Sequence, residues 1–359
     1  DERGERTVRM IVSKRAPLPG WIQLLVPVGA VLATLLLSAI PILIAGGDLW
    51  LSYTSLFRGA LGTRYNFLET CVKAAPLTFT GLAVAFAFRA KFWNIGAEGQ
   101  LLAGAIAAAW VGIYAPPLPK ALVLLLVCAA GFLAGGAWAT IPALLKTKYR
   151  VDDVVTTLLL NYVMWHLMGY LLFGPLQMPG SSWPRSPAVA EIARFPVLLI
   201  RSRFHLGILL ALVAVLVVWF VNSKTVFGYQ SRAVGVNPRA AAFGGINVNA
   251  VIMKTALLSG GLAGLAGVGE VVAIHFHLLM DISPGFGYSG IVIAMLGRLH
   301  PVGTALSAFF FSVIIVGAQS MSRLTGVPTY IAEVIQGMAL IVMLIALLLT
   351  EYRVKAVRD

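Results

Sequence analysis

Charged residues are scarce in this chain of 359 residues: only 11% are Asp, Glu, Lys or Arg, whereas 59% are hydrophobic and the mean hydropathy is +0.89. Soluble domains carry roughly 25% charged residues, so the composition excludes an ordinary soluble domain. Cysteine is rare too, and Cys71 and Cys128 lie far apart without metal-ligand spacing. The sequence therefore indicates a polytopic membrane protein whose core is a helix bundle in lipid.

Motifs for chemistry are also missing. No G-x-x-x-x-G-K-[ST] sequence occurs, so ATP would have to bind another polypeptide. No Ser-His-Asp set, carboxylate pair or thiol–imidazole spacing predicts an enzyme, and we expect no cofactor on this chain. The G-x-G-x-x-G match at 285–290 starts a hydrophobic segment instead of following a strand, so it does not predict a dinucleotide site. His275, His277 and Asp281 lack zinc-site spacing, and we predict no metal.

Apolar windows of about 20 residues predict an all-α fold with about ten transmembrane helices. The windows lie near 21–45, 67–88, 93–113, 121–145, 154–174, 204–222, 250–273, 284–297, 302–320 and 329–350. The third and eighth windows are interrupted by glycine, and the eighth is too short for a simple crossing, which predicts broken or re-entrant segments. Similar Gly-interrupted stretches at 94–110 and 282–297 also suggest an internal duplication, with a binding site where the two repeats meet.

The positive charges predict an orientation. With ten crossings, 17 Lys and Arg fall on the side of the N-terminus and eight on the other side, which predicts both termini in the cytosol. We expect cytosolic tails at 1–20 and 351–359, a transmembrane domain at 21–350, an external loop at 175–203 and a cytosolic loop at 223–249. This rule, together with attraction to anionic membrane lipid, explains the net charge of +13 without a nucleic acid partner.

A polar group stands inside the third window. Asn94, Glu98 and Gln100 interrupt a membrane-length apolar stretch, where a carboxylate normally faces a protein interior or a water-filled path. Together with a possible helix break, they predict a transport site. The alternative is that Glu98 only caps a helix end. Glu69 and Lys73, four residues apart in the second window, are predicted to neutralise one another.

The cytosolic loop contains a short sequence typical of a surface helix. Asn237 suits the N-cap, Pro238 suits the first helical position, and Gly244 suits the end. Phe243 would then protrude as a knob for a groove on another protein. The alternative is an ordinary amphipathic connector.

Four segments resemble a known family in the family's own order. They are FWNIGAEGQLLAGA (92–105), YRVDDVVTTLLLNYV (149–163), YQSRAVGVNPRAAAFGGIN (229–247) and GFGYSGIVIAMLGRLHPVG (285–303). Over about residues 20–350, the chain resembles permease subunits of bacterial nucleoside-type ABC importers, which are relatives of the ribose and branched-chain amino acid permeases. One departure is Asp152-Asp153 in place of Asn-Glu, and it keeps the capability to cap a helix.

This resemblance implies a multi-pass protein of the bacterial cytoplasmic (inner) membrane that imports a nucleoside. Its partners would be a second permease subunit, cytosolic ATP-binding cassette ATPases that carry the ATP and Mg, and an external solute-binding lipoprotein. Alternatives are import of riboflavin, a purine base or a simple sugar, or ion-coupled secondary transport with Glu98 or Glu270 as the coupling acid.

The resemblance also assigns candidate residues. The substrate pathway would be lined by Trp93, Asn94, Glu98, Gln100, Phe286, Tyr288 and Ser289, with the aromatic rings offering stacking faces. The helix that couples to the ATPase would use Arg232, Asn237, Pro238, Arg239 and Phe243.

Overall fold

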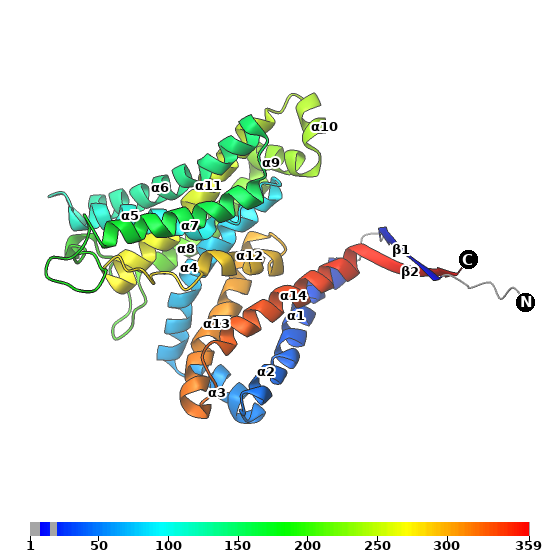
Figure 1. The fold of residues 1–359 in the computed structure, drawn as a ribbon, viewed down its shortest axis with the longest axis horizontal. Coiled ribbons are helices and arrows are strands. Elements are labelled where there is room, and N and C mark those ends of the chain that lie inside the picture. The colour runs from blue at the N-terminus through cyan, green and yellow to red at the C-terminus, as the bar shows by residue number, and fades with distance from the viewer. Residues whose placement is uncertain (1–7, 15–19, 359) are drawn as a thin grey trace, which may run out of the picture.

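The computed structural model describes residues 8–14 and 20–358 (Figure 1). The helices are α1 (Gly20–Leu37), α2 (Ala39–Ile44), α3 (Leu49–Leu61), α4 (Arg64–Arg89), α5 (Ala97–Ile113), α6 (Lys120–Tyr149), α7 (Asp153–Leu172), α8 (Leu206–Lys224), α9 (Val226–Val236), α10 (Pro238–Phe243), α11 (Val248–Gly269), α12 (Phe286–Leu296), α13 (Pro301–Thr325) and α14 (Ile331–Glu351). A 3-10 turn, η1 (Glu191–Ala193), a π-helix, η2 (Glu270–His275), and two terminal strands, β1 (Val8–Lys14) and β2 (Tyr352–Arg358), complete the described elements.

Seven helical stretches in the described part of the chain are long and apolar enough to cross a membrane: α4, α6, α7, α8, α11 with η2, α13 and α14. An eighth span arises if α1–α2 and α3 count as one, although they are bent by 119°. Helices α5 and α12 are apolar but shorter. Each predicted window contains a helix, yet the ten predicted transmembrane helices are not confirmed as ten crossings. The protein is a helical, multi-pass membrane protein.

Two helices form the centre of the bundle. In its most apolar window, α4 has 83% of its residues buried, against 22% for α7, so α4 is enclosed by protein while α7 lies at the periphery. Helix α11 packs against α4, α5 and α6. Gly264 of α11 lies against the backbones of Gly104 and Gly131, where a side chain would collide with a neighbouring helix. Small residues at this level therefore allow three helices to approach closely.

A second group of helices stands beside this bundle (Figure 1). Helix α13 packs on α3 and α4, and α14 packs on α1. Strands β1 and β2 pair antiparallel, so the two ends of the described chain lie next to each other. The termini are therefore on the same side of the molecule.

Helix α3 is the main element that the sequence did not predict. Its N-cap Asp48 accepts a hydrogen bond from the Leu51 amide at 2.6 Å, and Ser52, Ser55 and Leu56 are buried. Because these serines lower its hydropathy, no apolar window marks it. The cap residue after Gly46-Gly47 was the available signal.

Candidate functional site

The segment between α4 and α5 is held by a closed set of amide hydrogen bonds. The side-chain nitrogen of Asn94 donates to Gln100 Oε1 and to Ser259 Oγ, both at 2.9 Å. Its oxygen accepts from Gln100 Nε2 at 2.8 Å and from the Gly96 amide at 3.0 Å. These four bonds use the whole hydrogen-bonding capacity of the Asn94 side chain, which is fully buried. In this conformation Asn94 builds the wall of the site and has no group left for a ligand.

Helix α7 pins the same segment from the other side. Asp153 accepts from the Trp93 amide and from Lys146 Nζ, each at 2.6 Å. The Thr157 hydroxyl accepts from the Ile95 amide at 3.2 Å. Sequence reasoning missed these residues, although Asp153, Thr157 and Asn161 recur every four positions and so form a polar stripe along one face of a helix. That spacing was the signal.

Asn161 is the last member of this stripe along α7 and is buried. Its oxygen accepts from the Gly99 amide at 2.8 Å, and its nitrogen donates to the Ile95 carbonyl at 3.0 Å. The same nitrogen lies 3.3 Å from the hydroxyl of Tyr288. Asn161 therefore joins the start of α5 to the start of α12, the two segments that the sequence singled out as Gly-interrupted.

Glu98 lies where the N-termini of α5 and α12 meet. Its Oε2 accepts from the Gly287 amide at 2.7 Å, and the Ser283 side chain also bonds to it. A side chain at position 287 would collide with the Glu98 backbone, and the Thr80 hydroxyl of α4 donates to the Phe286 carbonyl at 2.9 Å. A carboxylate at the positive end of a helix is stabilised there. Glu98 thus caps α12, in addition to lying inside the bundle.

The predicted stacking residues differ in exposure. Trp93 is 42% exposed and meets Phe88 edge-on, with ring centroids 4.7 Å apart. Tyr288 is 39% exposed and Ser289 is half-buried, whereas Phe286 is only 1% exposed. Trp93 and Tyr288 therefore have faces open to a ligand in this conformation, and Phe286 is enclosed.

A second polar cluster lies beneath the loop between α7 and α8. The carboxylate of Glu69 accepts from Arg203 Nε at 3.0 and 3.1 Å and also pairs with Arg203 Nη2. Glu69 therefore pairs with Arg203, in contrast to the predicted pairing with Lys73. The hydrogen bond to Glu69 raises the pKa of the Arg203 guanidinium. This ion pair ties the loop to α4.

His205 and Glu270 face a small cavity in this cluster. The cavity, about 10 Å³, is lined by both side chains together with apolar residues of α4 and α11. His205 Nδ1 accepts from the Gly207 amide at 3.1 Å, and burial lowers the pKa of His205 to about 4. Glu270 lies in the π-helix, and its Oε2 is 3.4 Å from His275 Nε2.

The helix predicted after Asn237 is present as α10, at the top of Figure 1. The Asn237 side chain accepts from the amides of Arg239 and Ala240 at 3.0 and 3.1 Å, and Pro238 occupies the first turn. Phe243 is 97% exposed. Arg232 and Arg239 are also exposed and form no ion pair within the described residues.

Helix α9 connects this surface to the bundle. A side chain at Gly235 would collide with the carbonyl of Arg89, so α9 lies directly on the last turn of α4. Phe227 stacks on Phe86, with centroids 6.0 Å apart. The segment that follows Arg89 is the one held by Asp153, so α10 is linked through α9 to the polar site.

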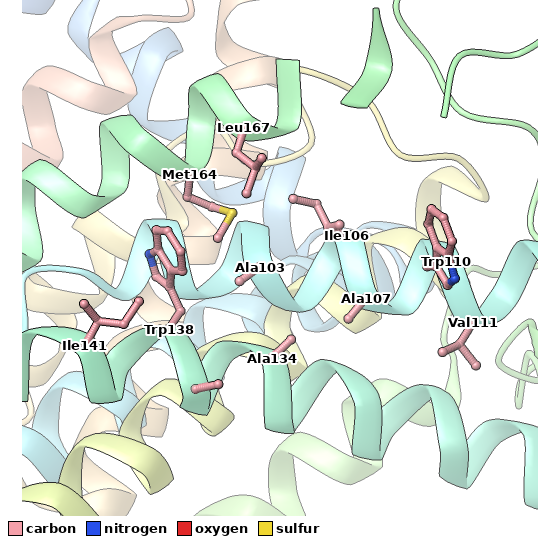
Figure 2. Close-up of a pocket in the computed structure, with 11 residues that line it drawn as sticks. Ala103, Ile106, Ala107, Trp110, Val111, Ala134, Trp138, Ile141, Met164 and Leu167 are labelled. Atoms are coloured by element: carbon pink, nitrogen blue, oxygen red, sulfur yellow. The ribbon is translucent and has the colours of Figure 1, made fainter. Parts of the chain in front are cut away.

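An apolar groove of about 540 Å³ opens between α5, α6 and α7 (Figure 2). Ile106 and Trp110 of α5, Trp138 of α6, and Met164 and Leu167 of α7 face it. It presents alkyl and aromatic surface and no charged side chain, so it does not suit a polar solute. The polar site lies at the other end of α5.

The chain matches known proteins over most of its length. Residues 66–344 match the family described as "Branched-chain amino acid transport system / permease component". A guanosine ABC transporter permease protein of Bacillus subtilis is 36% identical over 90% of this chain and 93% of its own length. A glucose ABC transporter permease protein of Haloferax volcanii is 34% identical over 97% and 94%.

A nucleoside ABC transporter permease protein of Lactococcus lactis is 30% identical over 87% of this chain and 88% of its own length. No solved structure gives a significant match. The resemblance drawn from the four sequence motifs is confirmed by these relatives. The chain therefore belongs to the branched-chain amino acid transport system/permease component family, and is a permease subunit of an ABC transporter rather than an enzyme.

Proposed function

We propose that this permease imports nucleosides across the bacterial cytoplasmic membrane when separate ATPases hydrolyse ATP. Two relatives are named as guanosine and nucleoside permeases, and one as a glucose permease. The open faces of Trp93 and Tyr288 beside hydrogen-bonding groups favour a planar, polar solute over a simple sugar. Riboflavin or a free purine base is the nearest alternative of the same chemistry.

The exposed α10 is the observation that carries the ATP-driven part of this proposal. A capped helix with a fully exposed phenylalanine and two exposed arginines has the form of a docking element for another protein. In this proposal, Arg232, Asn237, Pro238, Arg239 and Phe243 seat against a cytosolic ATP-binding cassette subunit. ATP and Mg bind that subunit and not this chain.

The movement of α10 has a direct route to the solute site. Since α9 lies on the Arg89 carbonyl, a displacement of α10 shifts the start of the 91–96 segment. That segment holds Trp93 and Asn94, and its hydrogen bonds connect it to α7 and α11. Asn161 of α7, which bonds to the Ile95 carbonyl, extends this connection to Tyr288 of α12. We propose that closure of the ATPase subunits rearranges the junction between the 91–96 segment and its hydrogen-bond partners, and so opens the path inward.

The pathway residues have different roles in this proposal. Trp93 and Tyr288 stack on the base, with Ser289 beside them. Gln100 keeps one donor and one acceptor beyond its bonds to Asn94, but it is buried and reaches the solute only when the site opens. Asn94 and Glu98 hold the wall in the conformation seen here and reach the solute only when the junction rearranges. Phe286 supports α12 from within the bundle.

The arrangement of the spans is also a proposal. The seven long stretches, the bent α1–α3 unit, α5 and α12 together provide ten membrane-embedded segments, with α5 and α12 as the Gly-interrupted members of an internal duplication. Both termini and α10 face the cytosol, and the 175–203 loop faces outward to receive solute from a binding lipoprotein. A second permease subunit completes the path.

The test is purification of the tagged chain from mild detergent with identification of the proteins that co-purify. Recovery of an ATPase with a G-x-x-x-x-G-K-[ST] sequence supports the proposal, and a co-purifying binding lipoprotein provides the protein on which to screen nucleosides, riboflavin and glucose. Solute uptake by the chain alone, driven by a proton gradient in proteoliposomes, would overturn it in favour of secondary transport.

A further inference from the structure

Lys73 places a positive charge inside the most enclosed helix of the bundle. It lies on α4, is half-buried, and has its Nζ 5.5 Å from the centre of the Phe286 ring. A lysine at membrane depth is costly and typically marks a solute path or an ion pair. The ring face stabilises the ammonium but does not neutralise it.

The nearby carboxylates are occupied elsewhere. Glu69, four residues earlier, is bound by Arg203, and Glu98 is bound by the Gly287 amide and Ser283. Within residues 8–14 and 20–358, no carboxylate lies within ion-pair distance of Lys73, and no group accepts a hydrogen bond from it. Within the described residues the Lys73 ammonium therefore keeps N–H donors without a hydrogen-bond partner.

The position of Lys73 suits a solute that enters beneath the external loop. Glu69, which ties that loop to α4, is one helical turn away, about 6 Å along the axis. Thr80, which bonds to the Phe286 carbonyl, lies about 10 Å further in the opposite direction. Along the α4 axis, Lys73 thus lies between the external loop and the start of α12. A solute that enters beneath the loop would pass Lys73 before it reaches the polar site at residues 92–100.

We propose that Lys73 selects solutes whose base carries two adjacent acceptors, namely 6-oxopurine nucleosides such as guanosine and inosine. This inference rests on the proposed nucleoside import. An ammonium has only donors, and guanine presents O6 and N7 side by side as acceptors, whereas adenine places an amino donor next to N7. Lys73 therefore favours the first group and disfavours adenosine.

The experiment measures ATP-driven uptake of guanosine, inosine and adenosine by the assembled complex in proteoliposomes. Glutamine suits the N6 and N7 edge of adenine, so Lys73→Gln should shift the guanosine-to-adenosine uptake ratio by about tenfold toward adenosine. Lys73→Arg should keep the preference for guanosine, because arginine also donates to O6 and N7. Lys254→Gln, at an exposed lysine on α11, should leave the ratio unchanged.

Several results would overturn the inference. Equal losses for guanosine and adenosine in Lys73→Gln would mean that the lysine only stabilises the bundle. An unchanged ratio in a complex that does import guanosine would remove Lys73 from recognition while leaving nucleoside import intact. A wild-type complex that imports glucose and no nucleoside would overturn both proposals. If Lys73→Gln fails to assemble, Lys73→Met, which has no polar group, should abolish the preference without reversing it.

Discussion

The polar junction, formed by residues 92–100 with Asp153, Asn161, Ser259 and Gly287, differs in kind from the α9–α10 hairpin, residues 226–243. In the junction, buried amides and carboxylates bond to one another and to the backbone. In the hairpin, Arg239 and Phe243 are exposed, and Arg239 forms no ion pair in the part of the chain that the structure describes. Stability and transport should therefore depend on different residues: changes in the junction lower both, and changes in the hairpin lower transport alone.

The largest effect on stability is expected from Gly287→Ala. Its new methyl group would collide with the Glu98 backbone, and overpacking of this kind costs about 1–3 kcal/mol. The thermal unfolding temperature in detergent should fall, and uptake should fall with it. The matched control is Gly337→Ala on α14, where nothing lies within 4 Å. Equal unfolding temperatures for the two variants would show that the two helix ends are not packed as described.

Asn94→Ala should have the next largest effect. It removes the partner of the Gln100 amide, while Ser259 keeps its bond to the Ala83 carbonyl, and the loss at Gln100 costs about 1–3 kcal/mol unless the site relaxes. Asn249→Ala, at an exposed position of α11, serves as the control and should be neutral in thermal unfolding. A variant Asn94→Ala that unfolds normally but no longer transports would break the comparison, because Asn94 would then act on the solute.

His205 provides a smaller, pH-dependent test on a buried polar group outside the junction. Burial lowers its pKa from 6.5 to about 4, so the unfolded chain gains a proton at higher pH than the folded chain does. Stability from this group is therefore full above pH 6.5 and is lost as pH falls toward 4. Between about pH 7.5 and 5.5 the loss is about 1 kcal/mol.

His205→Asn isolates the contribution of His205 to the pH dependence of stability. Asparagine can still accept a hydrogen bond from the Gly207 amide at the start of α8. The pH dependence of thermal unfolding should be flatter in the variant than in the wild type. Glu270, Arg203 and Glu69 surround the site and are unchanged in the comparison. Identical slopes for both proteins would mean that His205 is protonated at the same pH in the folded and unfolded chain.

The smallest effect on stability is expected in the α9–α10 hairpin. Arg239→Glu changes an exposed side chain, so unfolding should change by less than about 0.5 kcal/mol. In the assembled complex, however, stimulation of ATPase activity by loaded binding protein should be lost. Arg323→Glu, an exposed arginine at the end of α13, is the control for charge reversal. If Arg239→Glu retained this stimulation of ATPase activity, α10 would not be the element that couples the ATPase to the permease.

The sequence predicted the elements that local chemistry determines. The windows that became α6, α8 and α13 are long and apolar, and the Asn237 cap with Pro238 at the first turn predicted α10. Helix α3 was missed because its serines lower its hydropathy, and their burial depends on tertiary packing of a helix that lies on α13. The sequence drew attention to Glu270 as an acidic residue in an apolar window, but the π-helix around it has no local sequence signature.

The candidate site was predicted only in part, for a similar reason. The 92–100 and 285–290 segments do meet, yet the partners of their polar groups come from α4, α7 and α11. Pairing rules within one helix suggested Glu69 with Lys73, whereas Arg203 lies 134 positions away in sequence and takes that carboxylate. Long-range partners of this kind depend on packing, which a single sequence does not specify.

The most direct measurement is uptake of labelled guanosine into proteoliposomes that contain the assembled complex, with and without ATP, for the wild type and Arg239→Glu. ATP-driven import by this permease predicts uptake that requires ATP in the wild type and is lost in Arg239→Glu at an unchanged unfolding temperature. Uptake that follows a proton gradient without ATP, or that is undiminished in Arg239→Glu, would contradict it.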